Sequence, residues 1–410
     1  MKIGVFSESY KPYTSGVVTS IATFRTELER KGHEIFIFAP SYPEYKDEEN
    51  HIYRFSSIPA PSNPNYTLAV PIYPGLGLEV KRLQLDVVHA HSPFTLGRVG
   101  LKYARRLHLP MVFTYHTRYD QYVHYLKKAP AFAGDMTNKY SSYFCNLCDH
   151  IITPTSDIKN ILRNGEVTRP ISVIPTGVPL DKFEHGDGTW LKRHYQVPAD
   201  KKVLLFVGRL TQEKNIPFLV DSFKLIHEQY PASVLVLTAE GPMERELRQQ
   251  ASGLGLRPEV DVIFTGALPY DELTNVYHSA DLFVFSSLTE TQGLVLVEAM
   301  AAGLPVIAVR ATGVNDMVSH QQDGLICSPQ RREFADQVLQ VLNNPVLYQG
   351  LHQGALQKAE QMSSRSMAHK LESIYMKLID KNQQQRSSRL NLGHNFNEKL
   401  KEIKLTQKEM

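Results

Sequence analysis

Short apolar runs that alternate with helix-like segments limit the possible folds of this 410-residue chain more than any other feature. Such runs are typical of strands that are buried on both faces in a parallel sheet. In the first half we expect strands at residues 2–6, 34–39, 86–89, 111–114, 150–153 and 171–174. The pattern restarts at residues 202–208 and continues at 233–237, 262–265, 282–285 and 306–308. The predicted fold class is therefore α/β, with two Rossmann-like parallel-sheet domains.

The expected boundary between the domains lies within residues 174–179, where two prolines and a glycine interrupt the periodicity. We assign residues 1–177 to an N-terminal domain and residues 178–364 to a C-terminal domain. Residues 382–410 are rich in Gln, Asn, Lys and Ser, and we expect a polar basic tail that is frayed or disordered. The alternative is an amphipathic membrane anchor, with one apolar face made by Phe396, Leu400 and Ile403.

Composition narrows the class of protein. With 42% hydrophobic and 21% charged residues, the chain has the balance of a soluble globular protein. No apolar run approaches the ~20 residues that span a bilayer, and the N-terminus is typical of a buried strand rather than a signal peptide, so we expect a cytoplasmic location. Cys145 and Cys148 have redox or metal spacing, but they lie in an apparent helix without a second ligand pair, which favours core packing. We expect no metal site and no nucleic-acid partner.

The most informative motif is a pair of glutamates, Glu290 and Glu298, around a predicted helix start at Gly293. A ligand can approach the backbone closely at a glycine, and the N–H groups of Leu294 and Val295 suit a phosphate at a helix N-terminus. Glu298 can accept hydrogen bonds from a sugar diol, while Glu290 lies on the loop beside it. We therefore predict a site for a sugar joined to a diphosphate, which also includes Gln292.

The spacing of the two glutamates argues against a glycoside hydrolase. Along a helix an eight-residue offset spans about 12 Å, whereas the two carboxyl groups of a retaining hydrolase lie about 5 Å apart. The spacing favours ligand binding over hydrolysis.

Two further segments belong to the same predicted site. Gly208 and Arg209 follow the first strand of the second half, and Lys214 comes five residues after Arg209. At the carboxyl end of a strand, these cations can stabilise the charge on a departing nucleoside diphosphate, although they could also be ordinary surface charges. Gly16, at the start of the first helix, could contact the diphosphate from the other domain. The Gly-x-Gly-x-x-Gly fingerprint is absent from that turn, which argues against an NAD enzyme.

At these residues the chain resembles the family 4 retaining glycosyltransferases, which have the two-domain GT-B fold. The Glu-x7-Glu signature stands at Glu290 to Glu298, and the segments at Gly16, His116 and Gly208 to Lys214 occur in the family's order. The resemblance covers about residues 1–380. It implies two domains that face a cleft and a helix at residues 365–381 that returns to the N-terminal domain.

The resemblance also implies roles for individual residues. Glu298 would bind the ribose hydroxyls, Glu290 would lie near the donor sugar, and Gly241 would line the donor pocket, although a plain strand-to-helix turn is an alternative for Gly241. Transfer would be retaining, with the donor's own phosphate accepting the acceptor proton. His116 would bind a sugar or acceptor hydroxyl. The alternative is a histidine packed within the protein, with its ring hydrogen bonds satisfied there.

The acceptor prediction rests on residues 118–125, which look like the matching segment of bacterial diacylglycerol glucosyltransferases. Between residues 98 and 128 there are seven Lys or Arg residues and a single acid. Phe94 and Leu101 are expected beside a basic helix face that could contact an anionic bilayer, and an ordinary solvated helix face is the alternative. The basic face consists of Arg98, Lys102, Arg105 and Arg106.

Together these observations predict a metal-independent enzyme without a cofactor, bound peripherally to the inner face of the cell membrane. It would transfer glucose from UDP-glucose to diacylglycerol and form an α-glucosyl lipid. The alternatives are the same donor chemistry on phosphatidylinositol or a soluble sugar, an epimerase of the same fold, or a non-catalytic module that binds a nucleotide sugar.

Overall fold

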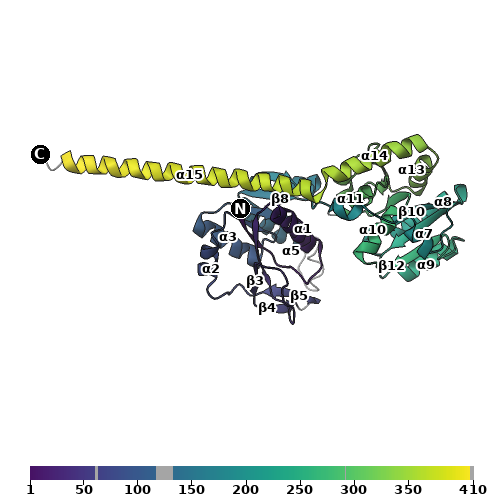
Figure 1. The fold of residues 1–410 in the computed structure, drawn as a ribbon, viewed down its shortest axis with the longest axis horizontal. Helices are drawn as coiled ribbons and strands as arrows, with labels where there is room; N and C mark the ends of the chain where they lie inside the picture. The colour runs from purple at the N-terminus through teal and green to yellow at the C-terminus, as the bar shows by residue number, and fades with distance from the viewer. Residues whose placement is uncertain (61–62, 117–132, 291, 407–410) are drawn as a thin grey trace. The chain divides into compact units, whose positions relative to one another are not determined.

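The computed structural model describes residues 1–60, 63–116, 133–290 and 292–406, and it divides into two compact units (Figure 1). Unit 1 comprises Met1–Thr153, Leu162–Ser172 and His369–Met410. Unit 2 comprises Pro154–Ile161 and Val173–Ala368. Each unit contains its own parallel sheet, so the prediction of two Rossmann-like domains is confirmed.

The sheet of unit 1 has seven strands in the order β3-β2-β1-β6-β7-β8-β9. The pairs from β3 through β8 run parallel. The strand order reverses at β1, whose neighbours are β2 on one side and β6 on the other. The strands are β1 Lys2–Phe6, β2 Glu34–Pro40, β3 Ile52–Phe55, β6 Val87–Ala90, β7 Met111–Thr114, β8 His150–Thr153 and β9 Ile171–Val173.

Helices cover the sheet of unit 1, and an antiparallel hairpin lies beside it. In helix α1 the side chains of Val18, Ile21, Phe24 and Leu28 are buried, at the spacing that turns one helix face toward a core. The side chain of Ser15 caps this helix by accepting a hydrogen bond from the Val18 amide. The elements are α1 Gly16–Arg30, α2 Leu76–Leu83, α3 Thr95–Leu107, α5 Ala133–Leu147, and the hairpin strands β4 Ser57–Ala60 and β5 Asn63–Ala69.

The last helix, α15 (Ser364–Thr406), extends through most of the segment for which we expected a polar tail. Its first part packs into unit 1 through Leu371 and Tyr375, which are 1% exposed. Further along, Arg386 donates hydrogen bonds to the carbonyls of Leu107 and His108 at the end of α3. The prediction of a frayed or disordered tail is wrong for the backbone up to residue 406. A docked helix continues without a new nucleation cost, and this segment, which has no proline, is rich in good helix formers.

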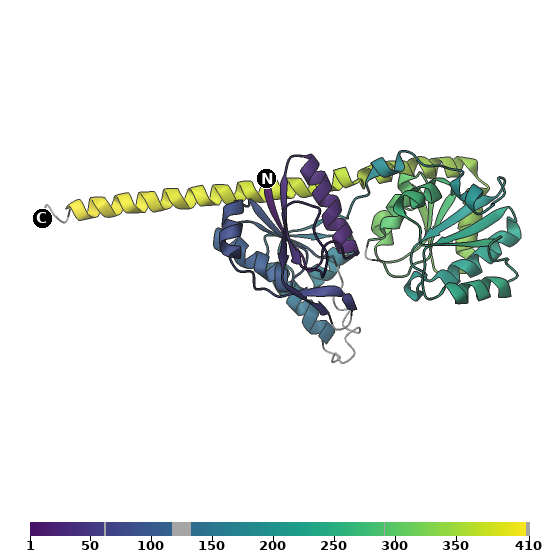
Figure 2. The same ribbon diagram turned by 60° about the horizontal axis from the view of Figure 1, so that its bottom comes forward.

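The sheet of unit 2 has six parallel strands in the order β12-β11-β10-β13-β14-β15, which is the same order of succession as in unit 1. Here the reversal lies at β10, between β11 and β13. Helices lie on both sides of this sheet (Figure 2). The strands are β10 Lys202–Val207, β11 Ser233–Thr238, β12 Val262–Gly266, β13 Leu282–Phe285, β14 Val306–Val309 and β15 Gly324–Cys327.

Helices and short turns follow the strands of unit 2. The longer helices are α8 Ile216–Gln229, α9 Glu244–Gly253, α10 Tyr270–His278, α11 Leu294–Ala301, α13 Arg331–Leu342 and α14 Pro345–Gln361. The short ones are α7 Trp190–His194 and α12 Val314–Met317, with 3₁₀ turns η2 at Leu180–Phe183 and η3 at Gln212–Lys214. Helix α6, Ser156–Asn164, begins in unit 2 and ends in unit 1.

Two further predictions concern the cysteines and membrane-spanning segments. Cys145 and Cys148 are free and fully buried, so their predicted role in core packing is confirmed. Within the described part of the chain, no helix has the length and apolar character needed to cross a membrane.

Candidate functional site

Both sheets bring polar residues together at the carboxyl ends of the strands where the strand order reverses, which is where open α/β sheets bind ligands. In unit 2 the loops after β10 and β13 meet at this point. The first loop carries Gly208, Arg209 and Lys214, and the second leads to Glu290. These four residues were predicted to act at one site, and the structure places both loops at the same edge.

An ion pair joins the two loops of unit 2. The Lys214 ammonium lies 2.6 Å from a carboxylate oxygen of Glu290, and the two side chains are only 20% and 16% exposed. The backbone beneath is also tied together, because the Ser286 hydroxyl donates to the Lys214 carbonyl at 2.8 Å and the Leu288 amide donates to the Glu213 carbonyl at 3.3 Å. A cation is thus held at the sheet edge, where it can face an anionic ligand.

Arg209 lies beside this pair and is far more open to solvent. Its side chain is 77% exposed, and its guanidinium lies 3.8 Å from the Glu213 carboxylate. An exposed pair at this distance holds a side chain only weakly. The preceding Gly208 has φ +153°, a backbone conformation that glycine adopts without strain. Arg209 can therefore move toward a bound phosphate at little cost.

Gly241 has a clear packing role. A Cβ at this position would lie 2.3 Å from the Leu210 carbonyl oxygen. The two loops are hydrogen-bonded as well, because the Leu210 amide donates to the Glu240 carbonyl and the Met243 amide donates to the Leu210 carbonyl, both at 3.1 Å. Only glycine permits this approach, so the loops after β10 and β11 are held in register. Whether Gly241 also lines a donor pocket stays a prediction.

The N-terminus of α11 is placed as the sequence indicated. Gly293 caps it with φ +72°, and a Cβ there would lie 3.1 Å from Glu290 Cγ. The first-turn residues Leu294 and Val295 supply N–H groups at the positive end of the helix dipole. The Gln292 side chain bonds to both backbone groups of Thr176, at 2.9 and 2.6 Å. This side chain therefore holds the 174–178 segment, and its contact with a ligand stays a prediction.

Glu298 lies on α11, one turn after the start of the helix. The Tyr277 hydroxyl donates a 2.9 Å hydrogen bond to it, and Tyr277 itself is fully buried. Burial raises the pKa of Glu298, while the bond from Tyr277 and the charge of Lys182 act in the opposite direction. The Lys182 ammonium lies 4.4 Å from the centroid of the Tyr270 ring. A carboxylate oriented in this way can accept hydrogen bonds from a diol.

In unit 1 the corresponding sheet edge, at the carboxyl ends of β1, β6 and β7, carries histidines instead of an ion pair. His91 follows β6 directly, and His116 follows the neighbouring strand β7. A hydrogen bond of 2.7 Å joins His91 Nδ1 to His116 Nε2. Burial lowers the pKa of His116 to about 4, and the pKa of His91 is also well below its usual value, mainly through burial. Both rings are therefore neutral near pH 7.

A third histidine lies beneath this pair. The ring centroids of His89 and His91 are 4.2 Å apart. Both nitrogens of His89 are bonded, Nδ1 to the Tyr375 hydroxyl at 2.5 Å and Nε2 to the Thr114 hydroxyl at 2.7 Å. Burial lowers the pKa of His89 to about 3. We call His89, His91 and His116 the histidine stack.

Glu8, two residues after β1, is a further titratable group at this edge. Its carboxylate accepts a 2.6 Å hydrogen bond from the Leu96 amide in the first turn of α3, where the N-cap residue Phe94 provides no side-chain bond. Burial raises the pKa of Glu8 to about 7. Neither Glu8 nor His91 was among the predicted site residues. Each comes two residues after a predicted strand, a position that does not mark a site by itself.

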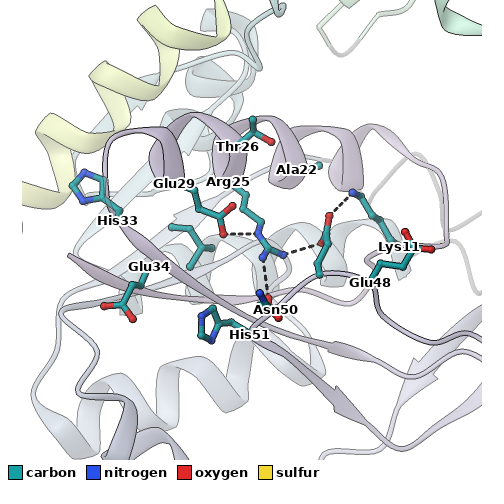
Figure 3. Close-up of a pocket in the computed structure, with 12 residues that line it drawn as sticks. Lys11, Ala22, Arg25, Thr26, Glu29, His33, Glu34, Glu48, Asn50 and His51 are labelled. Carbon is teal, nitrogen blue, oxygen red and sulfur yellow. Dashed lines mark hydrogen bonds and ion pairs between the residues drawn. The ribbon is translucent and has the colours of Figure 1, made fainter.

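The loop between Glu8 and Gly16 is anchored by a polar network in a pocket of unit 1 (Figure 3). Arg25 at its centre donates to Glu29 and Glu49, both at 2.8 Å, and to the Asn50 carbonyl at 2.9 Å. Glu49 in turn accepts a 2.7 Å hydrogen bond from the Tyr10 hydroxyl and one from Lys11. The network therefore fixes the loop that leads to Gly16. A Cβ on Gly16 would have no neighbour within 4 Å, so the start of α1 is open.

The basic face of α3 is exposed, as expected for Arg98, Lys102, Arg105 and Arg106. Leu101 is only 8% exposed, so the prediction that it lies beside the basic face is wrong, because it packs into the core. Phe94 is 37% exposed. The neighbouring helix α2 adds Leu78, which is 78% exposed, together with exposed Lys81 and Arg82. Residues 118–125, which carried the acceptor prediction, lie outside the described residues.

No group of three or more His, Cys, Asp and Glu side chains that could hold a metal ion occurs in the described ranges 1–60, 63–116, 133–290 and 292–406.

Comparison with known proteins gives consistent matches over both units. Residues 14–182 match the family model described as Glycosyltransferase Family 4, and residues 190–362 match Glycosyl transferases group 1. The alpha-monoglucosyldiacylglycerol synthase of Streptococcus pneumoniae is 34% identical over 335 residues, which cover 80% of this chain and 75% of that protein. The protein of the same name from Acholeplasma laidlawii is 31% identical over 395 residues, covering 93% and 98%.

A solved structure, that of Anabaena HepE in complex with UDP, shares the fold. It superposes with a TM-score of 0.73 at 20% identity and covers 92% of this chain and 100% of that chain.

Proposed function

The chain belongs to the family 4 glycosyltransferases of the GT-B fold, and from this premise we propose that it transfers glucose from UDP-glucose to diacylglycerol at a membrane surface. The observation that carries the acceptor is the name shared by two of its relatives, both alpha-monoglucosyldiacylglycerol synthases. The geometry of unit 2 supports the donor half of the reaction.

In the proposed reaction, unit 2 holds UDP-glucose. Glu298 accepts hydrogen bonds from the ribose hydroxyls, and the first turn of α11 binds the diphosphate. The bond between the anomeric carbon and the phosphate oxygen breaks as the acceptor oxygen bonds to the same face of that carbon. The departing phosphate takes the acceptor proton, so the configuration is retained.

The charge that develops on departing UDP is stabilised by Arg209 and Lys214. Lys214 is held by Glu290 in a partly buried site, where a fixed cation has more effect than in water. Glu290 then lies near the donor sugar. This scheme requires no metal ion and no cofactor.

The lipid acceptor requires contact with a bilayer, and we assign that contact to the exposed basic faces of α2 and α3. Each basic residue near an anionic surface contributes about 1 kcal/mol. Leu78 and Phe94 add exposed apolar surface to these two helices. The enzyme would then be bound peripherally at the inner face of the cell membrane.

The deciding experiment is transfer from labelled UDP-glucose to diacylglycerol in anionic liposomes containing EDTA. A labelled glycolipid supports the donor, the acceptor and the metal independence together. Label on phosphatidylinositol or on a free sugar, offered in parallel, would refute the diacylglycerol acceptor. UDP binding without any transfer would point to another donor sugar or to a non-catalytic module.

The membrane contact has a separate test. The double variant Arg105→Glu with Arg106→Glu should lower activity on anionic liposomes at least tenfold and leave hydrolysis of UDP-glucose unchanged. Lys370→Glu with Lys377→Glu, on exposed positions of α15, is the matched control and should retain activity. Equal losses in the two double variants would contradict the assignment to α3.

A further inference from the structure

Within the histidine stack, His91 makes a specific hydrogen bond to His116 as well as packing against it. His116 Nε2 is engaged by His91 Nδ1 at 2.7 Å, and the two rings are nearly parallel, with an interplanar angle of 19°. Because Nε2 is engaged, any hydrogen bond from His116 to a ligand must come from Nδ1. The state of Nδ1 then depends on His91, since two neutral rings that share one proton bridge have linked tautomers.

His91 is itself held in place. Its ring is 5% exposed and lies against His89, both of whose nitrogens are already bonded. Its backbone amide donates to the Phe6 carbonyl at 2.9 Å, next to the loop that carries Glu8. A buried ring whose backbone is hydrogen-bonded and whose face lies against a neighbouring ring, here tilted by 38°, is a rigid support, because it loses little further freedom when it orients a second ring.

We propose that His91 is a positioning residue that fixes the ring orientation and tautomer of His116, so that His116 Nδ1 meets a hydroxyl of the acceptor. This inference rests on the proposed function, since it takes the ligand to be a hydroxyl-bearing substrate. His91 does not touch the ligand and acts only through His116. A neutral imidazole suits this task, because it binds an uncharged hydroxyl without the cost of burying a charge.

Two variants of His91 separate positioning from packing, because the two roles predict opposite orders of activity for them. The amide of His91→Asn replaces the hydrogen-bonding group near Nδ1, whereas His91→Leu keeps apolar volume and loses the bond. We expect His91→Asn to retain kcat within about threefold, and His91→Leu to lose at least tenfold in kcat with little change in KM for UDP-glucose. If His91→Leu were as active as wild type, or more active than His91→Asn, His91 would be a packing residue and the inference would be wrong.

A second readout does not depend on turnover. In the full-length protein labelled with ¹⁵N-histidine, wild type should show scalar coupling between one nitrogen of His91 and one of His116 across the shared proton, and a single His116 tautomer. His91→Leu should abolish the coupling and give mixed His116 tautomers. Unchanged His116 signals in His91→Leu would overturn the inference. If wild type shows the coupling but makes no glycolipid, the proposed function fails while the hydrogen bond stands.

Discussion

The two units share one order of strands but place opposite chemistry at the point where that order reverses. Unit 1 presents the histidine stack and Glu8, whose pKa values are all shifted toward the neutral form by burial. Unit 2 presents the Lys214–Glu290 ion pair with exposed Arg209. The shared topology fixes where each site lies, and the side chains that follow each strand fix what it can bind.

This difference matches the two reacting partners of a glycosyl transfer. A departing diphosphate gains negative charge, which fixed cations stabilise. An acceptor hydroxyl is uncharged, and neutral rings can bind it without a desolvated charge. The comparison therefore predicts that unit 1 responds mainly to pH and that the chemistry of unit 2 responds mainly to loss of a cation.

Acidification should produce the largest difference in stability between the units. Each stack histidine has a lowered pKa, so the unfolded chain binds protons that the folded unit does not, and stability falls as pH drops below about 6.5. From pH 7 to pH 5 His89 and His116 should each cost about 2 kcal/mol, His91 acts in the same direction, and Glu8 offsets about 2 kcal/mol. Hydrogen exchange followed separately in the two units should show a loss of at least about 2 kcal/mol of protection in unit 1.

Unit 2 serves as the internal control for this measurement. Its His227 has a lowered pKa and its Glu298 a raised one, so their contributions oppose each other over the same pH range. Equal losses of protection in both units would remove the contrast between them.

Removal of the cation in unit 2 should come next in size. Lys214→Ala breaks the 2.6 Å ion pair with Glu290 and removes the fixed charge that we propose stabilises the leaving group, so we expect kcat to fall at least 100-fold, or about 3 kcal/mol. The matched control is Lys224→Ala, which breaks the Lys224–Glu228 pair on α8 of the same unit. If both variants lost similar activity, general destabilisation would explain the result.

Much of the fold could be predicted because its strands are strongly apolar. β7, β8 and β13 have the predicted bounds. The strands that escaped prediction are β3 and β15, each of four residues, and the hairpin strands β4 and β5. β3 reads Ile-Tyr-Arg-Phe, and β15 begins with a glycine, so neither shows a long apolar run. Such short strands form because the neighbouring strand already supplies hydrogen-bonding partners, which a local pattern does not reveal.

The candidate site was predictable only where a motif marked it. The sequence indicated Lys214 and Glu290 separately, but not that they pair across 76 positions, since that contact depends on the adjacency of β10 and β13. Glu8 and His91 belong to no spaced motif. Their importance emerges only from the strand order β1-β6-β7, which places Glu8, His91 and His116 after three adjacent strands.

Neutralising Glu8 should have a smaller effect, opposite in sign to that of the histidines. Burial raises the pKa of Glu8 to about 7 in the folded unit. The unfolded chain releases this proton above about pH 4.5, so the stability of the folded unit falls as pH rises from about 4.5 through 7. Glu8→Gln keeps an oxygen for the Leu96 amide and removes the charge. We expect the variant to gain about 2 kcal/mol over wild type between pH 5 and pH 8, measured by hydrogen exchange in unit 1. A difference that stays constant with pH would show that Glu8 is simply a helix cap.

The smallest predicted effect tests whether unit 2 depends on neutral hydrogen bonds as well as on charge. Tyr277→Phe removes the hydroxyl that donates to Glu298 and should weaken UDP binding about fivefold, the equivalent of about 1 kcal/mol. Calorimetric titration of UDP into Tyr277→Phe, Glu298→Gln and the double variant forms a complete cycle. If Tyr277 acts by orienting Glu298, its effect should shrink in the Glu298→Gln background. Additive losses would mean that the Tyr277 hydroxyl acts independently of Glu298, and the contrast between a neutral unit 1 and a charged unit 2 would then rest on Arg209, Lys214 and Glu290.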